Sequence, residues 1–137
     1  MHWPLAASAL ASVFAGALAL CVPALARAAP DAVHGELVYA RCMACHALAF
    51  DRVGPRHCGL LGRRAGSVAG FNYSAAMKKS RITWSDTTLD RFLTKPLKMV
   101  PGTAMTYDGV ADPKDRVDLI AYLKHANDTP ECAKQPH

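Results

Sequence analysis

The chain has 137 residues, 51% of them hydrophobic, and a formal net charge of +5. This length allows one small domain. The positive charge is too mild for a nucleic-acid-binding protein, and no stretch interleaves basic with aromatic residues, so we expect no nucleic-acid partner.

Residues 1–28 have the pattern of a secretory signal peptide. Residues 5–25 are almost wholly apolar and include Pro23, and the small-residue ending Ala26-Arg27-Ala28 is typical of a cleavage site. We therefore expect cleavage after Ala28. The remaining residues 29–137 would form one domain that is exported, in a bacterium, to the periplasm.

Two other interpretations of this N-terminus stay open. The apolar run is nearly long enough to span a bilayer, so it could be an uncleaved membrane anchor. It could also belong to a lipoprotein attached through Cys21, although Leu20 stands where such signals usually have a small residue. The first alternative would make the protein membrane-bound.

A helix is expected over residues 31–41, and the sequence Cys42-Met43-Ala44-Cys45-His46 follows it directly. Zinc motifs usually supply a second close pair of ligands, and a thioredoxin-like dithiol needs a βαβ pattern; neither is present here. Covalent haem attachment needs no further residues, because each thiol adds across one vinyl group and the histidine binds the iron. The motif therefore predicts one haem c.

Two more cysteines, Cys58 and Cys132, belong to the exported part of the chain. An oxidising compartment favours a disulfide between them, which would tie an early loop to the C-terminal tail. Closure of a loop of this length stabilises a fold by about 4 kcal/mol at most. Two unrelated free thiols are the alternative, because the sequence does not show that the two residues are near each other.

Two further helices are expected in the second half of the chain. Ser85 caps a segment that ends at Lys95-Pro96, and Asp112-Pro113 is an N-cap followed by proline at the first helical position. Val117, Ile120 and Leu123 share one stripe of the last helix. No strand is expected, so the fold class is all-α, and a haem would supply the apolar surface that so small a core lacks.

A haem bound through His46 has a sixth iron position to fill. Met105 is the best candidate, because it lies in a loop bounded by Pro101-Gly102 and Gly109 rather than in a helix, where methionine is usually core. Thioether sulfur suits a soft metal centre. The other candidates are Met43, Met77, Met99, His34, His57, His125 and His137.

Seven motifs occur in order along the chain: CMACH, RVGP, GLLGRRAG, GFNYS, ITW, PGTAM and DLIAYLK. Over Gly35 to Ala126 the chain therefore resembles the class I c-type cytochromes, such as mitochondrial cytochrome c and bacterial cytochromes c2 and c550. The resemblance implies the small cytochrome c fold, with three main helices plus short helices and long loops wrapped around one covalently bound haem. It also implies that Gly35 and Tyr39 lie where the first helix crosses the last, near Leu119 and Tyr122.

The resemblance implies roles for nine residues. Cys42 and Cys45 would hold the haem by thioether bonds, and His46 and Met105 would be the axial ligands of the iron. Pro55 would accept a hydrogen bond from the His46 ring and so orient it. The groups expected to hydrogen-bond the haem propionates are Arg63, Tyr73, Trp84 and Thr103.

The chain also departs from the mitochondrial pattern. Phe92 replaces a tyrosine hydroxyl near the methionine sulfur, and Met77 replaces an asparagine of the same buried network. Leu97 and Ala104 stand in place of lysines around the exposed haem edge. Basic residues that match this ring are Arg41, Arg52 and Lys98. We therefore expect partner docking through a weaker positive face.

The resemblance implies a soluble, monomeric, single-haem electron carrier that is not an enzyme. Its redox partners would be a bc1-type complex, a terminal oxidase, a photosynthetic reaction centre or a periplasmic dehydrogenase. It would meet the membrane through these partners, unless its N-terminus is uncleaved and makes it a fixed subunit of a dehydrogenase. A ligand-binding haem protein, such as a gas sensor or peroxidase, would need Met105 to be displaced; peroxidases also use a distal His/Arg pair, and none is evident.

Overall fold

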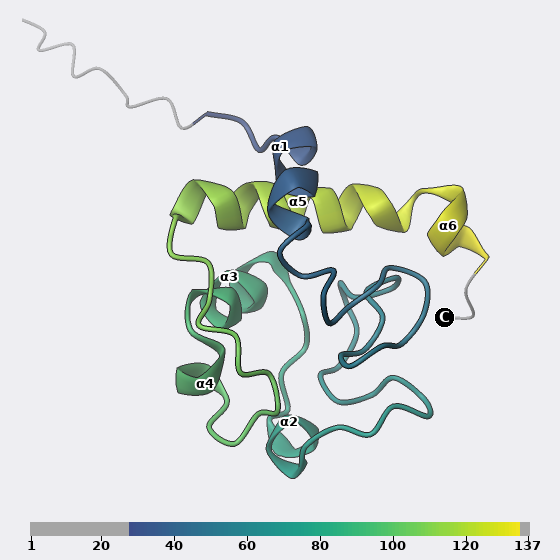
Figure 1. Ribbon diagram of the computed structural model, residues 1–137, viewed down its shortest axis with the longest axis vertical. Coiled ribbons are helices and arrows are strands. Elements are labelled where there is room, and N and C mark those ends of the chain that lie inside the picture. Colours follow the sequence, from purple (N-terminus) through teal and green to yellow (C-terminus); the bar gives the residue numbers. More distant parts are fainter. Residues whose placement is uncertain (1–27, 135–137) are drawn as a thin grey trace, which may run out of the picture.

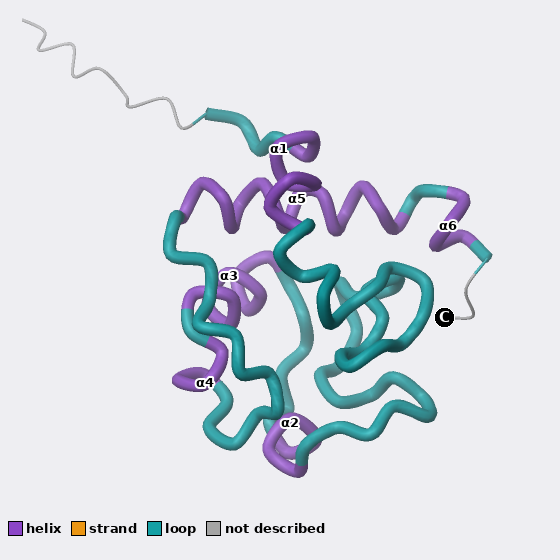
Figure 2. The backbone as a smooth tube through the Cα atoms, in the orientation of Figure 1, coloured by secondary structure: helices purple, strands orange, loops and turns teal. Residues whose placement is uncertain are grey.

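The computed structural model describes residues 28–134 of the chain. Within this range the protein forms six helices and no strand, which confirms the all-α class. Long loops connect the helices on the side of the molecule below α5 (Figures 1 and 2). The helices are α1 (Ala32–Tyr39), α2 (Ala75–Lys79), α3 (Asp86–Thr94), α4 (Pro96–Met99), α5 (Pro113–Asn127) and α6 (Pro130–Ala133).

Helix α1 crosses α5, as Figure 1 shows. The Asp31 side chain caps α1 by accepting hydrogen bonds from two amides of its first turn, and the helix ends at Tyr39, two residues earlier than expected. A Cβ atom on Gly35 would lie 2.0 Å from the carbonyl oxygen of Asp118 in α5. The crossing therefore requires glycine at this position, in agreement with the predicted contact.

Helix α5 begins as predicted, with Asp112 as N-cap and proline at its first position. In the predicted apolar stripe, Ile120 and Leu123 are buried and Val117 is half-buried. Two charged residues of this helix are buried as well. One of them, Arg116, donates to Asp90 and to the backbone carbonyls of residues 110 and 111, which satisfies its guanidinium group.

The second buried charge, Asp118, joins α5 to α1. Its side chain is fully buried and accepts hydrogen bonds from the Asp31 amide, a ring nitrogen of His34 and the ammonium group of Lys114. Burial acts to raise the pKa of Asp118, but these donors outweigh it and lower the pKa to about 2. The carboxylate therefore stays charged and links the two helices.

Helix α3 also follows its local signals. Ser85 and Thr88 form a capping box at its start, and the helix ends just before Lys95-Pro96, as predicted. Its buried face carries Leu89, Phe92 and Leu93, which pack into the main core together with residues of α5.

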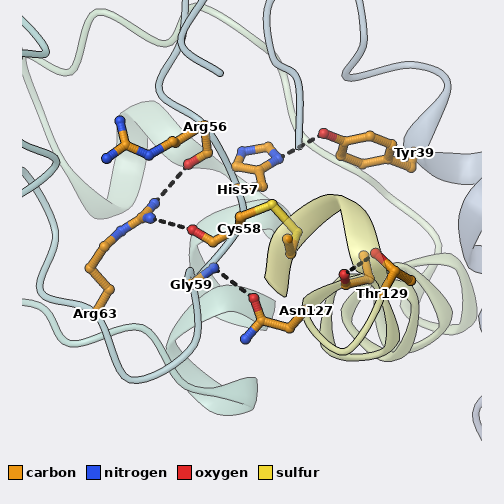
Figure 3. Close-up of a disulfide and its surroundings, with 10 residues drawn as sticks. Tyr39, Arg56, His57, Cys58, Gly59, Arg63, Asn127 and Thr129 are labelled. Atoms are coloured by element: carbon orange, nitrogen blue, oxygen red, sulfur yellow. Dashed lines mark hydrogen bonds between the residues drawn. A yellow bond between two sulfur atoms is a disulfide. The ribbon is translucent and has the colours of Figure 1, made fainter. Parts of the chain in front are cut away.

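A disulfide joins Cys58 to Cys132, across a separation of 74 residues, and so resolves the alternatives for this pair. Beside it, the Gly59 amide donates to the side chain of Asn127 at 2.6 Å (Figure 3). The tail at α6 is therefore held against an early loop. Because Cys58 and Cys132 are bonded to each other, they are not available as ligands of a structural zinc site, which would need them as well as Cys42 and Cys45.

Residues 1–27 and 135–137 lie outside the described residues. The expected signal peptide, the anchor and lipoprotein alternatives and the ligand candidate His137 all fall wholly or largely there. Among residues 28–134, no helix is long and apolar enough to cross a membrane.

Candidate functional site

A cavity of about 500 Å³ lies among the helices and loops. This volume is within the range of small-molecule and cofactor sites. The fold brings to it residues from segments far apart in the chain, including all nine that the sequence indicated. They are Cys42, Cys45, His46, Pro55, Arg63, Tyr73, Trp84, Thr103 and Met105.

The His46 ring is oriented by the loop that follows it. Its Nδ1 atom donates a hydrogen bond to the carbonyl oxygen of Pro55 at 2.8 Å, so Nε2 presents a lone pair. Gly54 lies so close that a Cβ atom there would be 2.2 Å from Cε1 of the ring. Burial lowers the pKa of His46, although the bond to Pro55 acts in the opposite direction. The neutral ring is a suitable metal ligand.

The two thiols lie in a tight turn just before this ring. The amides of Cys45 and His46 both donate to the carbonyl oxygen of Cys42, at 3.1 and 2.9 Å. Neither cysteine is in a disulfide. Cys42 is half-buried, and this burial raises the pKa of its thiol to about 11, whereas Cys45 is exposed. Both sulfur atoms are therefore available at one edge of the cavity.

Met105 enters the cavity from the loop between α4 and α5. It is half-buried and packs against the core. Its amide donates to the hydroxyl of Thr103 at 3.3 Å, and Thr103 is itself buried. Thr103 thus contacts the backbone of the ligand candidate, a link that the sequence did not indicate.

Other candidates for the sixth iron position are less well placed. Met43 and His125 are exposed, and Met99 is not among the residues that line the cavity. His34 is bound to Asp118. Met77 lines the cavity but belongs to the buried core.

The residues expected to bind propionates form another part of the cavity wall. Arg63 donates to the carbonyl oxygens of Arg56 and Cys58, both at 2.8 Å. Tyr73 is half-buried, and burial raises the pKa of its hydroxyl. Trp84 is buried beside Phe92, with ring centroids 5.0 Å apart.

Three of the four departures from the mitochondrial pattern also line this cavity: Phe92, Met77 and Ala104. Phe92 and Met77 are both buried there and place apolar groups where the mitochondrial pattern has polar ones.

The sequence offered His57 only as a candidate for the sixth iron position, but in the structure it lines the cavity beside His46. Its ring stacks on the His46 ring, with centroids 4.3 Å apart and an interplanar angle of 21°. It also shares a hydrogen bond with the Tyr39 hydroxyl at 3.1 Å. Burial, and then the neighbouring His46 and Arg63, hold the pKa of His57 well below its usual value, so the ring is neutral.

The cytochrome c family profile matches residues 32–127. The chain belongs to the cytochrome c family. It is 47% identical over 108 residues to cytochrome c2 of Rhodomicrobium vannielii, which covers 77% of this chain and 86% of that protein. It is 40% identical over 115 residues to cytochrome c2 of Blastochloris viridis, covering 82% and 91%.

Cytochrome cH from Methylobacterium extorquens shares the fold. It has 45% sequence identity and a TM-score of 0.68, and the match covers 69% of this chain and 98% of that structure. The cytochrome c fold, predicted from the order of motifs, is therefore confirmed.

Membership of the family means that the protein is a single-haem electron carrier with one haem c attached through cysteines. The residues present fit that group. The apolar cavity, the two thiols outside any disulfide and the lone pair on His46 are what a covalently bound haem requires.

Proposed function

We propose that this cytochrome is exported to the bacterial periplasm and there carries one electron at a time between redox proteins, with His46 and Met105 as the axial ligands. The observation that carries the proposal is the cavity, which gathers the CMACH motif and Met105 from opposite halves of the domain. The signal-like residues 1–28 support export.

The bound haem supplies an iron that alternates between the ferric and ferrous states. Pro55 and Gly54 keep the His46 ring in one orientation, and Thr103 helps to hold the loop that presents Met105. With His46 and Met105 both bound to it, the iron would have no open position for a substrate, and little would have to move on electron transfer. This arrangement suits a carrier rather than an enzyme.

Propionate groups need polar partners when they are buried. Four residues of the cavity wall can supply them: Arg63, Tyr73, Trp84 and Thr103. Arg63 already donates to two backbone carbonyls, so its part is to keep a positive charge near the propionates as well as to fix the loop.

Electrons would enter where the cavity reaches the surface. Cys45, Val53 and Ala104 line the cavity and are also exposed, so they mark its mouth. The exposed side chain of Met43 is adjacent in sequence. Basic charge at the mouth comes from Arg41, which lines the cavity, and from Arg52, which donates to the Met43 carbonyl, whereas Lys98 lies on α4 and does not line the cavity. This mixed surface suits docking that depends only moderately on salt.

The proposed partners are therefore large redox proteins that dock without a strongly acidic face. They are a bc1-type complex, a terminal oxidase, a photosynthetic reaction centre or a periplasmic dehydrogenase. Stopped-flow rates with each class, measured over a range of ionic strength, would rank them.

The ligation is tested by adding carbon monoxide to the dithionite-reduced protein. We expect no spectral change for the native protein, but ready binding by the Met105→Ala variant because its sixth position is open. Met99→Ala is the matched control, since Met99 is also half-buried but does not line the cavity, and it should behave like the native protein. Ready binding of carbon monoxide by the native protein would contradict the proposed carrier function and would indicate a ligand-binding haem protein.

Export is tested separately, by N-terminal sequencing of the protein purified from the periplasmic fraction and from the membrane fraction. A mature N-terminus near residue 29 supports a free carrier. A retained N-terminus in the membrane fraction would instead support a fixed subunit of a larger complex.

A further inference from the structure

We propose that His57 is a positioning residue for the axial ligand His46 and that the face of its ring stabilises the ferric state of the haem. The inference rests on the proposed function, in which His46 binds the iron. It assigns a role to a residue that otherwise would be regarded as core filling.

The stack itself is the first observation. The His57 and His46 rings lie 4.3 Å apart between centroids and are nearly parallel, at 21°. Pro55 holds the edge of the His46 ring through Nδ1. His57 covers a face of the same ring, so the two contacts restrain different motions of the ligand.

His57 is held in turn by helix α1. The Tyr39 hydroxyl shares a hydrogen bond with Nδ1 of His57 at 3.1 Å, as Figure 3 shows. Tyr39 is 3% exposed, and its ring lies 5.1 Å from the ring of Tyr122 on α5. The orientation of His57 is therefore connected to the crossing of the two main helices.

The backbone on both sides of His57 is also restrained. Its own amide donates to the carbonyl oxygens of Ala47 and Leu48, both at 3.1 Å. The Arg63 guanidinium bridges the carbonyls of the residues before and after it (Figure 3). The residue after it, Cys58, is in the disulfide. A side chain with this many restraints is suited to set the position of another.

The electronic effect follows from the charge distribution of a neutral aromatic ring. Such a ring has a negative face, which attracts positive charge. An imidazole bound to ferric iron carries more positive charge than one bound to ferrous iron. The His57 face should therefore stabilise the ferric state more than the ferrous state, and so lower the reduction potential.

The test compares His57→Leu with His57→Phe in the holo-protein by spectroelectrochemical titration. His57→Leu removes the ring face, and we expect its potential to rise, so that the ferric-to-ferrous ratio at the native midpoint falls roughly twofold to fivefold. His57→Phe keeps a ring face and should stay closer to the native potential. A role in packing alone would not distinguish the two variants in this way.

Three results would overturn the proposal: an unchanged potential in His57→Leu, a lower potential in that variant, or equal shifts in both variants. If His57→Leu fails to take up haem, Tyr39→Phe serves instead, because it removes only the hydroxyl that holds His57. In that variant an upward shift of the potential supports the proposal, and an unchanged or lower potential overturns it.

Carbon monoxide is added to reduced samples of the native protein and each variant in the same series. Binding by the native protein would mean that the proposed axial ligation is wrong. If no sample binds carbon monoxide and the potentials contradict the expectation, the proposed function stands and the role of His57 alone fails.

Discussion

Replacing Cys58 and Cys132 together by alanine removes the bond between the early loop and α6. The two positions are 74 residues apart in sequence, and for a loop of this length the chain-entropy relation gives about 4 kcal/mol at 25 °C as an upper value. Both side chains are buried, so lost packing adds to the effect. We expect the free energy of unfolding to fall by about 2–4 kcal/mol, a large part of the stability of a small domain.

The measurement is guanidinium unfolding of the holo-proteins, followed by far-ultraviolet circular dichroism and analysed by linear extrapolation. The single variants Cys58→Ala and Cys132→Ala are the controls, because either one already breaks the bond. Each should therefore lose nearly as much stability as the double variant. A loss below about 1 kcal/mol in the double variant, or losses that add between the singles, would refute the reasoning.

Three other predictions follow from close contacts and buried charge. Gly35→Ala should lower the free energy of unfolding by roughly 1–3 kcal/mol in the same assay, because a Cβ atom at Gly35 meets the backbone of α5. The control Glu36→Ala changes an exposed neighbour and should be nearly neutral. Equal losses of stability in the two variants would contradict this prediction. Gly54→Ala should reduce the yield of correctly ligated holo-protein, seen in the visible spectrum, because it collides with the His46 ring; a native spectrum at full yield would argue against it. The lowered pKa of Asp118 means that its contribution to stability is present above its unfolded pKa, near 4, and is lost as pH falls toward about 2. Asp118→Asn should flatten this part of the stability–pH curve, whereas the exposed control Asp108→Asn should not.

The parts of the fold that sequence predicted well are those set by neighbouring residues. Asp112 and Pro113 begin α5, and Pro96 stops α3, through contacts within one turn of chain. The charged residues Arg116 and Asp118 should have faced solvent by the same local reasoning. They are buried because each also has a partner distant in sequence: Asp31 is 87 residues from Asp118, and Asp90 is 26 residues from Arg116.

In the site, too, the features set by neighbouring residues could be predicted from the sequence, and those that depend on the fold could not. The CMACH motif is contiguous, so its chemistry could be recognised without a structure, and the order of later motifs indicated Met105. The stack of His57 on His46 could not be predicted, because it depends on the path of a loop without regular structure. The sequence also left the pairing of Cys58 with Cys132 undecided, because only the fold brings these two residues together.

The axial pair is the central claim of this account, and proton NMR of the ferrous protein tests it most directly. A methionine methyl group bound to the iron lies over the haem face, so the ring current moves its signal far upfield of the other protein signals. We predict that this signal is present in the native protein and in Met77→Leu but absent in Met105→Ala. Its survival in Met105→Ala, or its loss in Met77→Leu, would contradict the assignment of Met105 as the ligand.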